Sequence, residues 1–180
     1  EWRRLEPVLR SVRSVFPDVR LSIDTYWSDV VVRAYDLIGD FIVNDISSGE
    51  DDPMMLLTVG KLGLSYVAMH KRGNSVNMQS LTDYADVVGE LLTYFNHFAQ
   101  NALRFEIKDW ILDPGFGFAK TLVQNYEILS RLDEFKVFDR PVLTGVSRKS
   151  MIYKRFNISP EDTLPATQVL HMKALQLGAD

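Results

Sequence analysis

The sequence predicts an α/β protein built on a parallel sheet. Helical and strand-like segments alternate along the chain, the strand-like segments are nearly continuous apolar runs, and polar or ionisable residues follow each of them directly. Strands of this composition are typical of parallel sheets whose faces are covered by helices. Because five predicted strands cannot close a barrel of eight, the pattern fits either a complete open, doubly wound sheet or a (β/α)8 barrel seen without some of its strands.

Three helix and strand pairs open the chain. In the first helix, apolar residues recur at intervals of three and four, and Pro17 ends it. Ser28 and Asp29 can cap the second helix, which Gly39 stops. In order, the expected elements are a helix over 2–16, a strand over 21–25, a helix from 28 to 39, a strand over 41–45, a helix from 52 to 63 and a strand over 64–70.

The second half continues the alternation. Residues 71–81 are polar and rich in Gly, Asn and Ser, which indicates a loop, and Thr82 opens the longest predicted helix. The remaining expected elements are that helix to about 103, a strand over 109–113, a helix through 126–132, a strand over 141–146, a polar loop, and a helix from about 163 to 177. No internal repeat or linker indicates a second domain.

Composition excludes several classes of protein. A length of 180 residues suits one domain, and a net charge of −4 without a basic stripe argues against a nucleic-acid partner. No apolar run is long enough to predict a membrane span. The chain has no cysteine, and its three histidines lack zinc-ligand spacing, so neither disulfides nor a zinc site are expected. We expect a cytoplasmic protein; the chain starts at Glu1 rather than Met, so a targeting segment upstream would lie outside it.

The ends of the predicted strands carry the candidate chemistry. Parallel strands gather ligands at their carboxyl ends, where Asp24, Asn44, Asp113 and Lys149 would supply acceptors, a donor and a cation for a flat heterocycle. Asp113 is the most specific candidate, because the Pro-Gly that follows it forces a turn. This turn leaves a carboxylate that is able to accept two parallel N–H bonds. The alternative is structural: these residue types also cap helices, and a buried Asp113 could simply hold its own turn.

Two neighbouring segments have weaker signals. Gly115–Thr121 is rich in glycine but has neither dinucleotide nor P-loop spacing, so no nucleotide site is expected. Ser147–Ser150 places two cations and two hydroxyls after the last strand, where they could hold an anionic or carbonyl-bearing ligand or form a solvated loop. His70 lies beside two cations, but a lone histidine is more often structural than catalytic.

Five segments, in this order and spacing, resemble the dihydropteroate synthase family. They are Ser22–Thr25, Asn44–Ile46, Met69–Gly73, Leu112–Phe118 and Gly145–Ser150. The resemblance implies a (β/α)8 TIM barrel whose third to seventh strands lie in this chain, so that residues 1–180 form a single pterin-binding barrel domain, incomplete at both ends. It also implies the joining of 6-hydroxymethyl-7,8-dihydropterin pyrophosphate to p-aminobenzoate in folate synthesis.

The resemblance assigns roles residue by residue. The pterin-binding side chains would be Asp24, Asn44, Ile46, Met69, Asp113 and Lys149. The p-aminobenzoate side would be lined by Phe118, Arg148 and Ser150. The family implies Mg²⁺, whose Asn ligand would lie before residue 1, and a homodimer. The chain alone would lack the pyrophosphate-binding segment after strand eight and is not expected to turn over.

Two rival readings stay open. The related pterin-binding domain of corrinoid-dependent methyltransferases resembles this chain in its Asp and Asn strand ends, whereas the loop Ser147–Lys149 favours the synthase. A non-catalytic homologue that only binds a pterin would retain the same strand ends. Affinity for a reduced methyl-folate without affinity for the aryl acid would indicate the methyltransferase.

Overall fold

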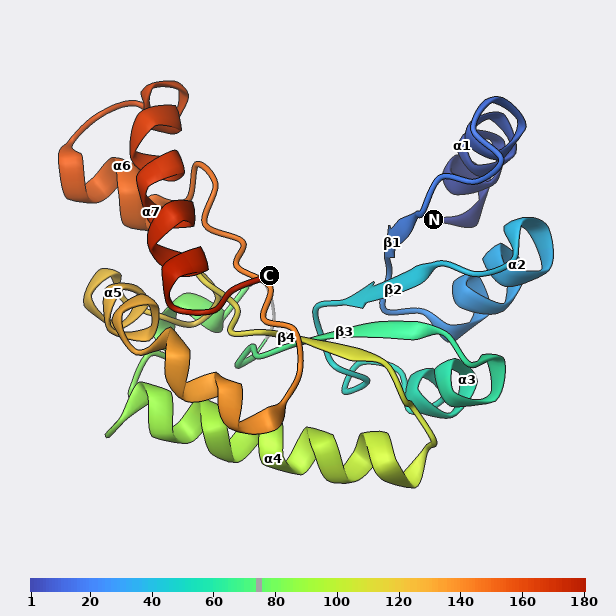
Figure 1. Ribbon diagram of the computed structural model, residues 1–180, viewed down its shortest axis with the longest axis horizontal. Coiled ribbons are helices and arrows are strands. Elements are labelled where there is room, and N and C mark those ends of the chain that lie inside the picture. The colour runs from blue at the N-terminus through green and yellow to red at the C-terminus, as the bar shows by residue number, and fades with distance from the viewer. Residues whose placement is uncertain (74–75) are drawn as a thin grey trace. The chain divides into compact units, whose positions relative to one another are not determined.

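Helices and parallel strands alternate along the chain in the computed structural model, which describes residues 1–73 and 76–180 (Figure 1). The strands are β1 (Ser22–Asp24), β2 (Ile42–Asp45), β3 (Ser65–Met69) and β4 (Trp110–Asp113). The α-helices are α1 (Trp2–Val15), α2 (Ser28–Ile38), α3 (Met55–Leu62), α4 (Val87–Arg104), α5 (Leu122–Ser130), α6 (Ser150–Phe156) and α7 (Leu164–Gln176). Short 3-10 helices are η1 (Met78–Ser80), η2 (Leu132–Phe138) and η3 (Pro160–Thr163).

The chain divides into two compact units. The first comprises Glu1–Ala68 and Phe98–Trp110, and the second comprises Met69–His97 and Ile111–Asp180. No helix among the described residues combines the length and the apolar character that crossing a bilayer requires.

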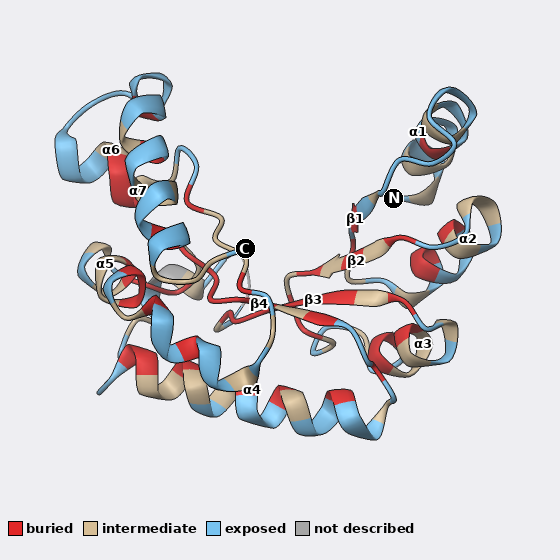
Figure 2. Ribbon diagram, in the orientation of Figure 1, coloured by how far each residue is buried: buried red, intermediate tan, exposed pale blue. Residues whose placement is uncertain are grey.

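In the first unit, β1, β2 and β3 pair in parallel, with Val43 opposite both Ile23 and Tyr66. The Tyr66 N–H donates to the Asp109 carbonyl at 3.0 Å, so the strand order is β1-β2-β3-β4. Buried residues, red in Figure 2, run along β3. Tyr66 also stacks on Phe98 with ring centroids 5.7 Å apart. Burial of such aromatic and branched side chains provides the main stabilisation of this unit.

In the second unit, the end of β3 continues beside β4, where the His70 N–H donates to the Asp113 carbonyl at 3.1 Å. The predicted strand over 141–146 is reduced to a single bridge between Leu112 and Val142. The side chain of Phe95 packs edge-on against Phe135, and both are fully buried. The core of this unit therefore forms around α4 and η2 rather than around a fifth strand.

Two helices differ from the prediction. The helix α4 begins at Val87 rather than at Thr82, because the Asp86 carboxylate accepts hydrogen bonds from the N–H groups of Val88 and Gly89 and so caps it there. The helix α6 replaces part of the predicted polar loop. It has only seven residues, too few for a periodic apolar pattern, and it is recognisable from its buried Met151 and Ile152.

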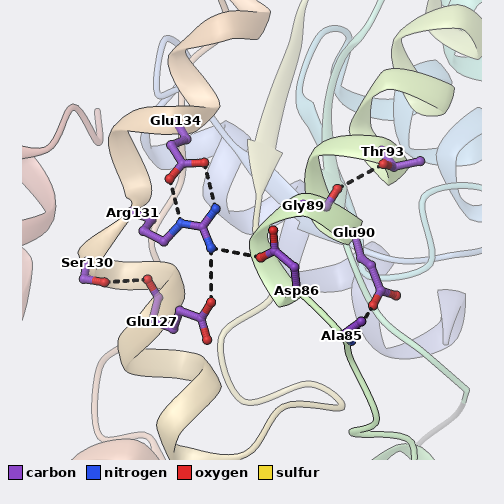
Figure 3. Close-up of polar contacts among 9 residues, drawn as sticks. All are labelled: Ala85, Asp86, Gly89, Glu90, Thr93, Glu127, Ser130, Arg131 and Glu134. Atoms are coloured by element: carbon purple, nitrogen blue, oxygen red, sulfur yellow. Dashed lines mark hydrogen bonds and ion pairs between the residues drawn. The ribbon is translucent and has the colours of Figure 1, made fainter.

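A cluster of charges fixes the start of α4 against α5 (Figure 3). Arg131 Nη1 lies 2.9 Å from Asp86 Oδ1 and 3.1 Å from Glu127 Oε1, and Nε lies 2.6 Å from Glu134 Oε1. The carboxylates raise the pKa of Arg131 above its usual value, chiefly because Glu134 and Asp86 accept its hydrogen bonds. Asp86 therefore serves as a helix cap and as an ion-pair partner together.

Candidate functional site

Asp24 and Asn44 lie side by side at the carboxyl ends of β1 and β2, as Cα partners in the strand register. Burial raises the pKa of Asp24, and the negative charges of Glu1 and Asp45 raise it further. The first unit thus brings together two of the four side chains that the sequence predicts to bind a heterocycle. It stays a prediction that all four side chains line one binding pocket.

A cavity of about 690 Å³ opens in the first unit between α1 and the end of β1. Asp24 and Ile46, both predicted site residues, line it together with Thr25 and Tyr26. This volume lies within the range of small-molecule sites. The cavity therefore offers a polar acceptor beside an apolar wall.

The fully buried Asp45 organises the turn that carries Ile46. Its Oδ1 accepts hydrogen bonds of 2.7 Å from both the N–H and the hydroxyl of Ser47, and its Oδ2 accepts from the Gly49 N–H at 2.8 Å and from the Tyr66 hydroxyl at 2.6 Å. A carboxylate that receives this many donors fixes the backbone that surrounds it. Sequence reasoning missed Asp45, because Tyr66, which links it to β3, becomes its neighbour only in the fold.

In the second unit, Asp113 ends β4 and is 9% exposed. Its Oδ1 accepts a 2.8 Å hydrogen bond from the Gly115 N–H, so the turn-holding role considered from the sequence is present. Burial raises the pKa of Asp113, while that N–H bond and the charges of Lys149 and Lys120 oppose the rise. The turn uses Oδ1, and the carboxylate has a second oxygen for a ligand.

Lys149 lies beside this carboxylate. Its ammonium donates to the Phe116 carbonyl at 2.5 Å and stands 5.1 Å from the centre of the Phe118 ring. Burial lowers the pKa of Lys149, and the negative charge of Asp113 opposes that shift. The second unit therefore brings together Asp113, Lys149 and Phe118, three of the predicted site residues.

The other predicted residues of the second unit occupy the strand end and the loop before α6. Met69 is buried as the last residue of β3, and its carbonyl accepts a 3.4 Å hydrogen bond from the Tyr94 hydroxyl. Arg148 has a φ of 53°, and its N–H donates to Thr167 Oγ1 at 3.4 Å. Ser150 is the first residue of α6.

Lys120, another residue that sequence reasoning missed, is close enough for its charge to act on Asp113. It is 4% exposed, and its ammonium lies 3.0 Å from His70 Nδ1. Burial lowers the pKa of Lys120 to about 7, and the charges of Lys149 and Arg72 act in the same direction. Burial, with the charges of Lys120 and Arg72, lowers the pKa of His70 to about 2. The only sequence signal was a lysine that closes a glycine-rich turn of otherwise apolar residues.

Comparisons with known proteins identify the family of the chain. The family model described as pterin binding enzyme matches residues 1–180. The chain belongs to the pterin-binding enzyme family. It is 40% identical to the folic acid synthesis protein fol1 of Pneumocystis carinii over 98% of this chain and 25% of that protein. It is 36% identical to dihydropteroate synthase of Escherichia coli K12 over 99% of this chain and 63% of that enzyme.

Solved structures of dihydropteroate synthases are similar to this chain in fold. The chain matches dihydropteroate synthase from Thermus thermophilus with a TM-score of 0.92 and 34% identity, over 99% of this chain and 71% of that one. It matches the Yersinia pestis enzyme with a TM-score of 0.90 and 33% identity, over 97% and 63%. The chain thus spans less than two thirds of the length of the first curated relatives. Its fold is that of part of a (β/α)8 barrel, which confirms the predicted fold class.

The described residues contain no preformed cluster of metal ligands: within the ranges 1–73 and 76–180, no three His, Asp or Glu side chains gather as metal ligands would. Mg²⁺ usually keeps several waters and takes one or two carboxylates together with substrate phosphates, so a Mg²⁺ site does not require such a cluster.

Proposed function

We propose that the protein carrying this chain is a dihydropteroate synthase, which condenses 6-hydroxymethyl-7,8-dihydropterin pyrophosphate with p-aminobenzoate to 7,8-dihydropteroate and pyrophosphate. The observation that carries the proposal is the buried carboxylate of Asp113, in the field of the Lys149 and Lys120 ammonium groups. The matched Thermus enzyme has been solved with 4-aminobenzoate and with the substrate abbreviated 6HMPPP, and relatives spanning this chain have the same enzyme name.

The pterin would be held by its hydrogen-bonding edge. In this proposal Asp113 accepts paired N–H bonds from the amino-pyrimidine edge, and Lys149 donates to the ring carbonyl or to a ring nitrogen. A buried carboxylate suits this task, because its charge-assisted bonds gain strength where water is excluded. The residues proposed to complete the pterin site are Asp24, Asn44, Ile46 and Met69.

The aryl acid would lie on the side of the loop before α6. Phe118 offers a ring face, Ser150 a hydroxyl, and Arg148 supports the loop through its backbone bond to Thr167. The position of the Lys149 ammonium near the Phe118 ring supports this placement, because one cation would then adjoin both substrates.

The chemistry is a displacement at carbon. The lone pair of the aryl amine attacks the methylene next to the dihydropterin ring, a C–N bond forms, the C–O bond to pyrophosphate breaks, and pyrophosphate leaves with the electron pair. The amine then releases one proton to water. Such a reaction depends on positioning and charge stabilisation more than on a nucleophilic side chain, which suits a site of acceptors and cations.

Three further properties belong to the same proposal. We propose a homodimer, supported by the exposed apolar side chains of Val169, Met172 and Leu175 on α7, and light scattering of the intact protein tests it. Mg²⁺ as the metal of the intact enzyme and a cytoplasmic location also stay proposals. Synthesis by intact enzyme stripped with EDTA, with and without added Mg²⁺, tests the first.

The function is tested on the intact gene product with both substrates and Mg²⁺. Wild-type protein is expected to form dihydropteroate and pyrophosphate, whereas Asp113→Asn should lose at least about tenfold in pterin affinity, because the amide replaces one of the two acceptor oxygens with an NH2 donor and removes the charge. Asp133→Asn, at an exposed carboxylate of the same unit, is the control and should match wild type. Absence of product from wild type, or unchanged pterin affinity in Asp113→Asn, would contradict the proposal.

The two alternative functions predict different results in ligand-binding titrations. A corrinoid-dependent methyltransferase domain should bind a reduced methyl-folate and ignore p-aminobenzoate. A non-catalytic homologue should bind the pterin and yield no product with p-aminobenzoate. Binding of p-aminobenzoate that strengthens once the pterin pyrophosphate is present would favour the synthase over both.

A further inference from the structure

The ammonium of Lys120 is surrounded by acceptors from two places in the chain. Lys120 Nζ lies 3.0 Å from the Gly115 carbonyl, 2.9 Å from the Phe118 carbonyl, 3.0 Å from His70 Nδ1 and 3.4 Å from the His70 carbonyl. The first two acceptors are the two ends of the turn that follows β4, and the other two belong to the residue that follows β3. One buried side chain therefore ties two neighbouring strand ends together.

The N–H donors of the Lys120 ammonium suit the acceptors that surround it. An ammonium group has three N–H donors and no acceptor, so it is suited to a pocket of carbonyl oxygens. With its pKa near 2, His70 is neutral at ordinary pH. Nδ1 then accepts from Lys120, and the ring carries its proton on Nε2. A side chain without N–H donors at position 120 would remove the donor to the Phe118 carbonyl, the His70 carbonyl and His70 Nδ1.

The backbone beside Lys120 is crowded. Gly115 has a φ of 72°, and a Cβ built on it would lie 2.1 Å from the His70 carbonyl oxygen. This approach of the turn to β3 places the Gly115 N–H on Asp113 Oδ1 and leaves Phe118 near Lys149. Because Lys120 bonds to both sides of that contact, it holds the turn where Asp113 and Phe118 need it.

We infer that Lys120 is a positioning residue, which fixes the Gly115–Phe118 turn and thereby places Phe118 for the aryl acid. This inference rests on the proposed synthase function. Lys120 is almost wholly buried and is given no contact with either substrate, so its effect would pass through the turn. Its loss should therefore weaken the use of p-aminobenzoate more than the chemical step.

Four charged or titratable groups face Lys120. His70 and Arg72 come from the end of β3 and the segment after it, Asp113 from β4, and Lys149 from the loop before α6. Burial lowers the pKa of Lys120 to about 7; the charge of Asp113 opposes this shift, and the charges of Lys149 and Arg72 add to it. Protonated Lys120 makes charge-assisted bonds to the turn, and these weaken as the pH rises through about 7. The KM for p-aminobenzoate should rise over the same interval.

The test compares Lys120→Met with wild type and with Lys136→Met, an exposed lysine of the same unit, all in the intact protein. Lys120→Met is expected to raise the KM for p-aminobenzoate at least about tenfold, to change kcat less than about threefold, and to abolish the rise of KM above pH 7. Lys136→Met should behave as wild type. Melting curves are recorded for each variant, so that loss of folding is told apart from loss of positioning.

Chemical rescue supplies the second readout. Lys120→Cys can be alkylated in the unfolded state with 2-bromoethylamine to restore an ammonium; residues 1–180 contain no other cysteine, and wild type treated alike controls for alkylation elsewhere in the intact protein. Rescue should return the KM to within about threefold of treated wild type. The inference is overturned by a folded Lys120→Met with wild-type KM and pH profile, or by a refolded, alkylated protein that gains nothing. Failure of wild type to make product would instead overturn the proposed function, and this inference with it.

Discussion

The Tyr66 hydroxyl donates a 2.6 Å hydrogen bond to Asp45 Oδ2, and both side chains are fully buried. A residue in β3 thereby supports the turn that follows β2. The same carboxylate accepts from Ser47 and Gly49, so the turn that carries Ile46 depends on a contact between two strands. The position of Ile46 and the stability of this end of the sheet therefore depend on the same carboxylate.

A double-mutant cycle on this pair should show strong coupling. Tyr66→Phe removes one donor and should lower the free energy of unfolding by about 1–2 kcal/mol, and Asp45→Asn, which turns one of the two acceptor oxygens into an NH2 donor facing two N–H or O–H donors, by about 2–4 kcal/mol. The double variant should lose at least about 1 kcal/mol less than the sum of the two. Urea unfolding measures all four proteins, and strict additivity would mean that the bond contributes nothing of its own.

Two glycines with similar φ angles test the close approach at the end of β4. Gly115 has a φ of 72° and Gly63 one of 67°, yet a Cβ at Gly63 would meet nothing within 4 Å, whereas at Gly115 it would clash with the His70 carbonyl. Gly63 lies in the left-handed region with a ψ of 25°, so Gly63→Ala should cost only about 1 kcal/mol of left-handed strain. Gly115→Ala should cost at least about 2 kcal/mol more, because a backbone carbonyl must move.

The same pair of variants separates stability from binding. Under conditions where both remain folded, Gly115→Ala should also weaken pterin binding, since its N–H bond to Asp113 is displaced. Gly63→Ala should bind as wild type. Equal unfolding free energies for the two variants would show that the turn adapts without strain.

How far the sequence predicts this structure depends on the range of the interaction. Pro17 and Gly39 bound their helices as expected, because such signals act on the local backbone. The strand over 141–146 was overestimated, since an apolar run shows burial but not a hydrogen-bonded neighbour. Residues at strand ends could be proposed as a site from topology alone. Lys120 and Asp45 could not, because what defines them is the set of acceptors or donors that folding places around them.

His70 predicts a specific pH dependence of stability. Its pKa is lowered from 6.5 to about 2 in the folded protein, so between these values the unfolded chain binds a proton that the folded chain does not. The contribution to stability is complete above pH 6.5 and is lost as the pH falls, at about 1.4 kcal/mol per pH unit for a single site.

The measurement compares wild type with His70→Asn, which retains an acceptor but cannot titrate, and with His97→Asn at an exposed position. Urea unfolding at pH 7.5 and 5.5 should show a smaller acid loss for His70→Asn than for the other two proteins. A His70 ring that titrates near pH 6.5 by NMR would contradict the neutral, buried imidazole.

The Arg131 cluster predicts a salt-sensitive stabilisation. Arg131 meets three carboxylates, of Asp86, Glu127 and Glu134, whereas the exposed Arg33 pairs with Asp29 at 2.9 Å, four residues apart on α2. Isolated exposed pairs contribute little, but a planar guanidinium shared by several acids is better ordered. Arg131→Met should therefore lower the melting temperature by about 2–6 °C at low salt, and Arg33→Met by less than about 2 °C.

In 1 M NaCl the losses of melting temperature in the two variants should converge, because screening removes most of the attraction between exposed charges. Arg131→Lys, which keeps the charge without the fork of donors, should fall between wild type and Arg131→Met; a lysine variant as stable as wild type would show that net charge rather than geometry holds α4 to α5.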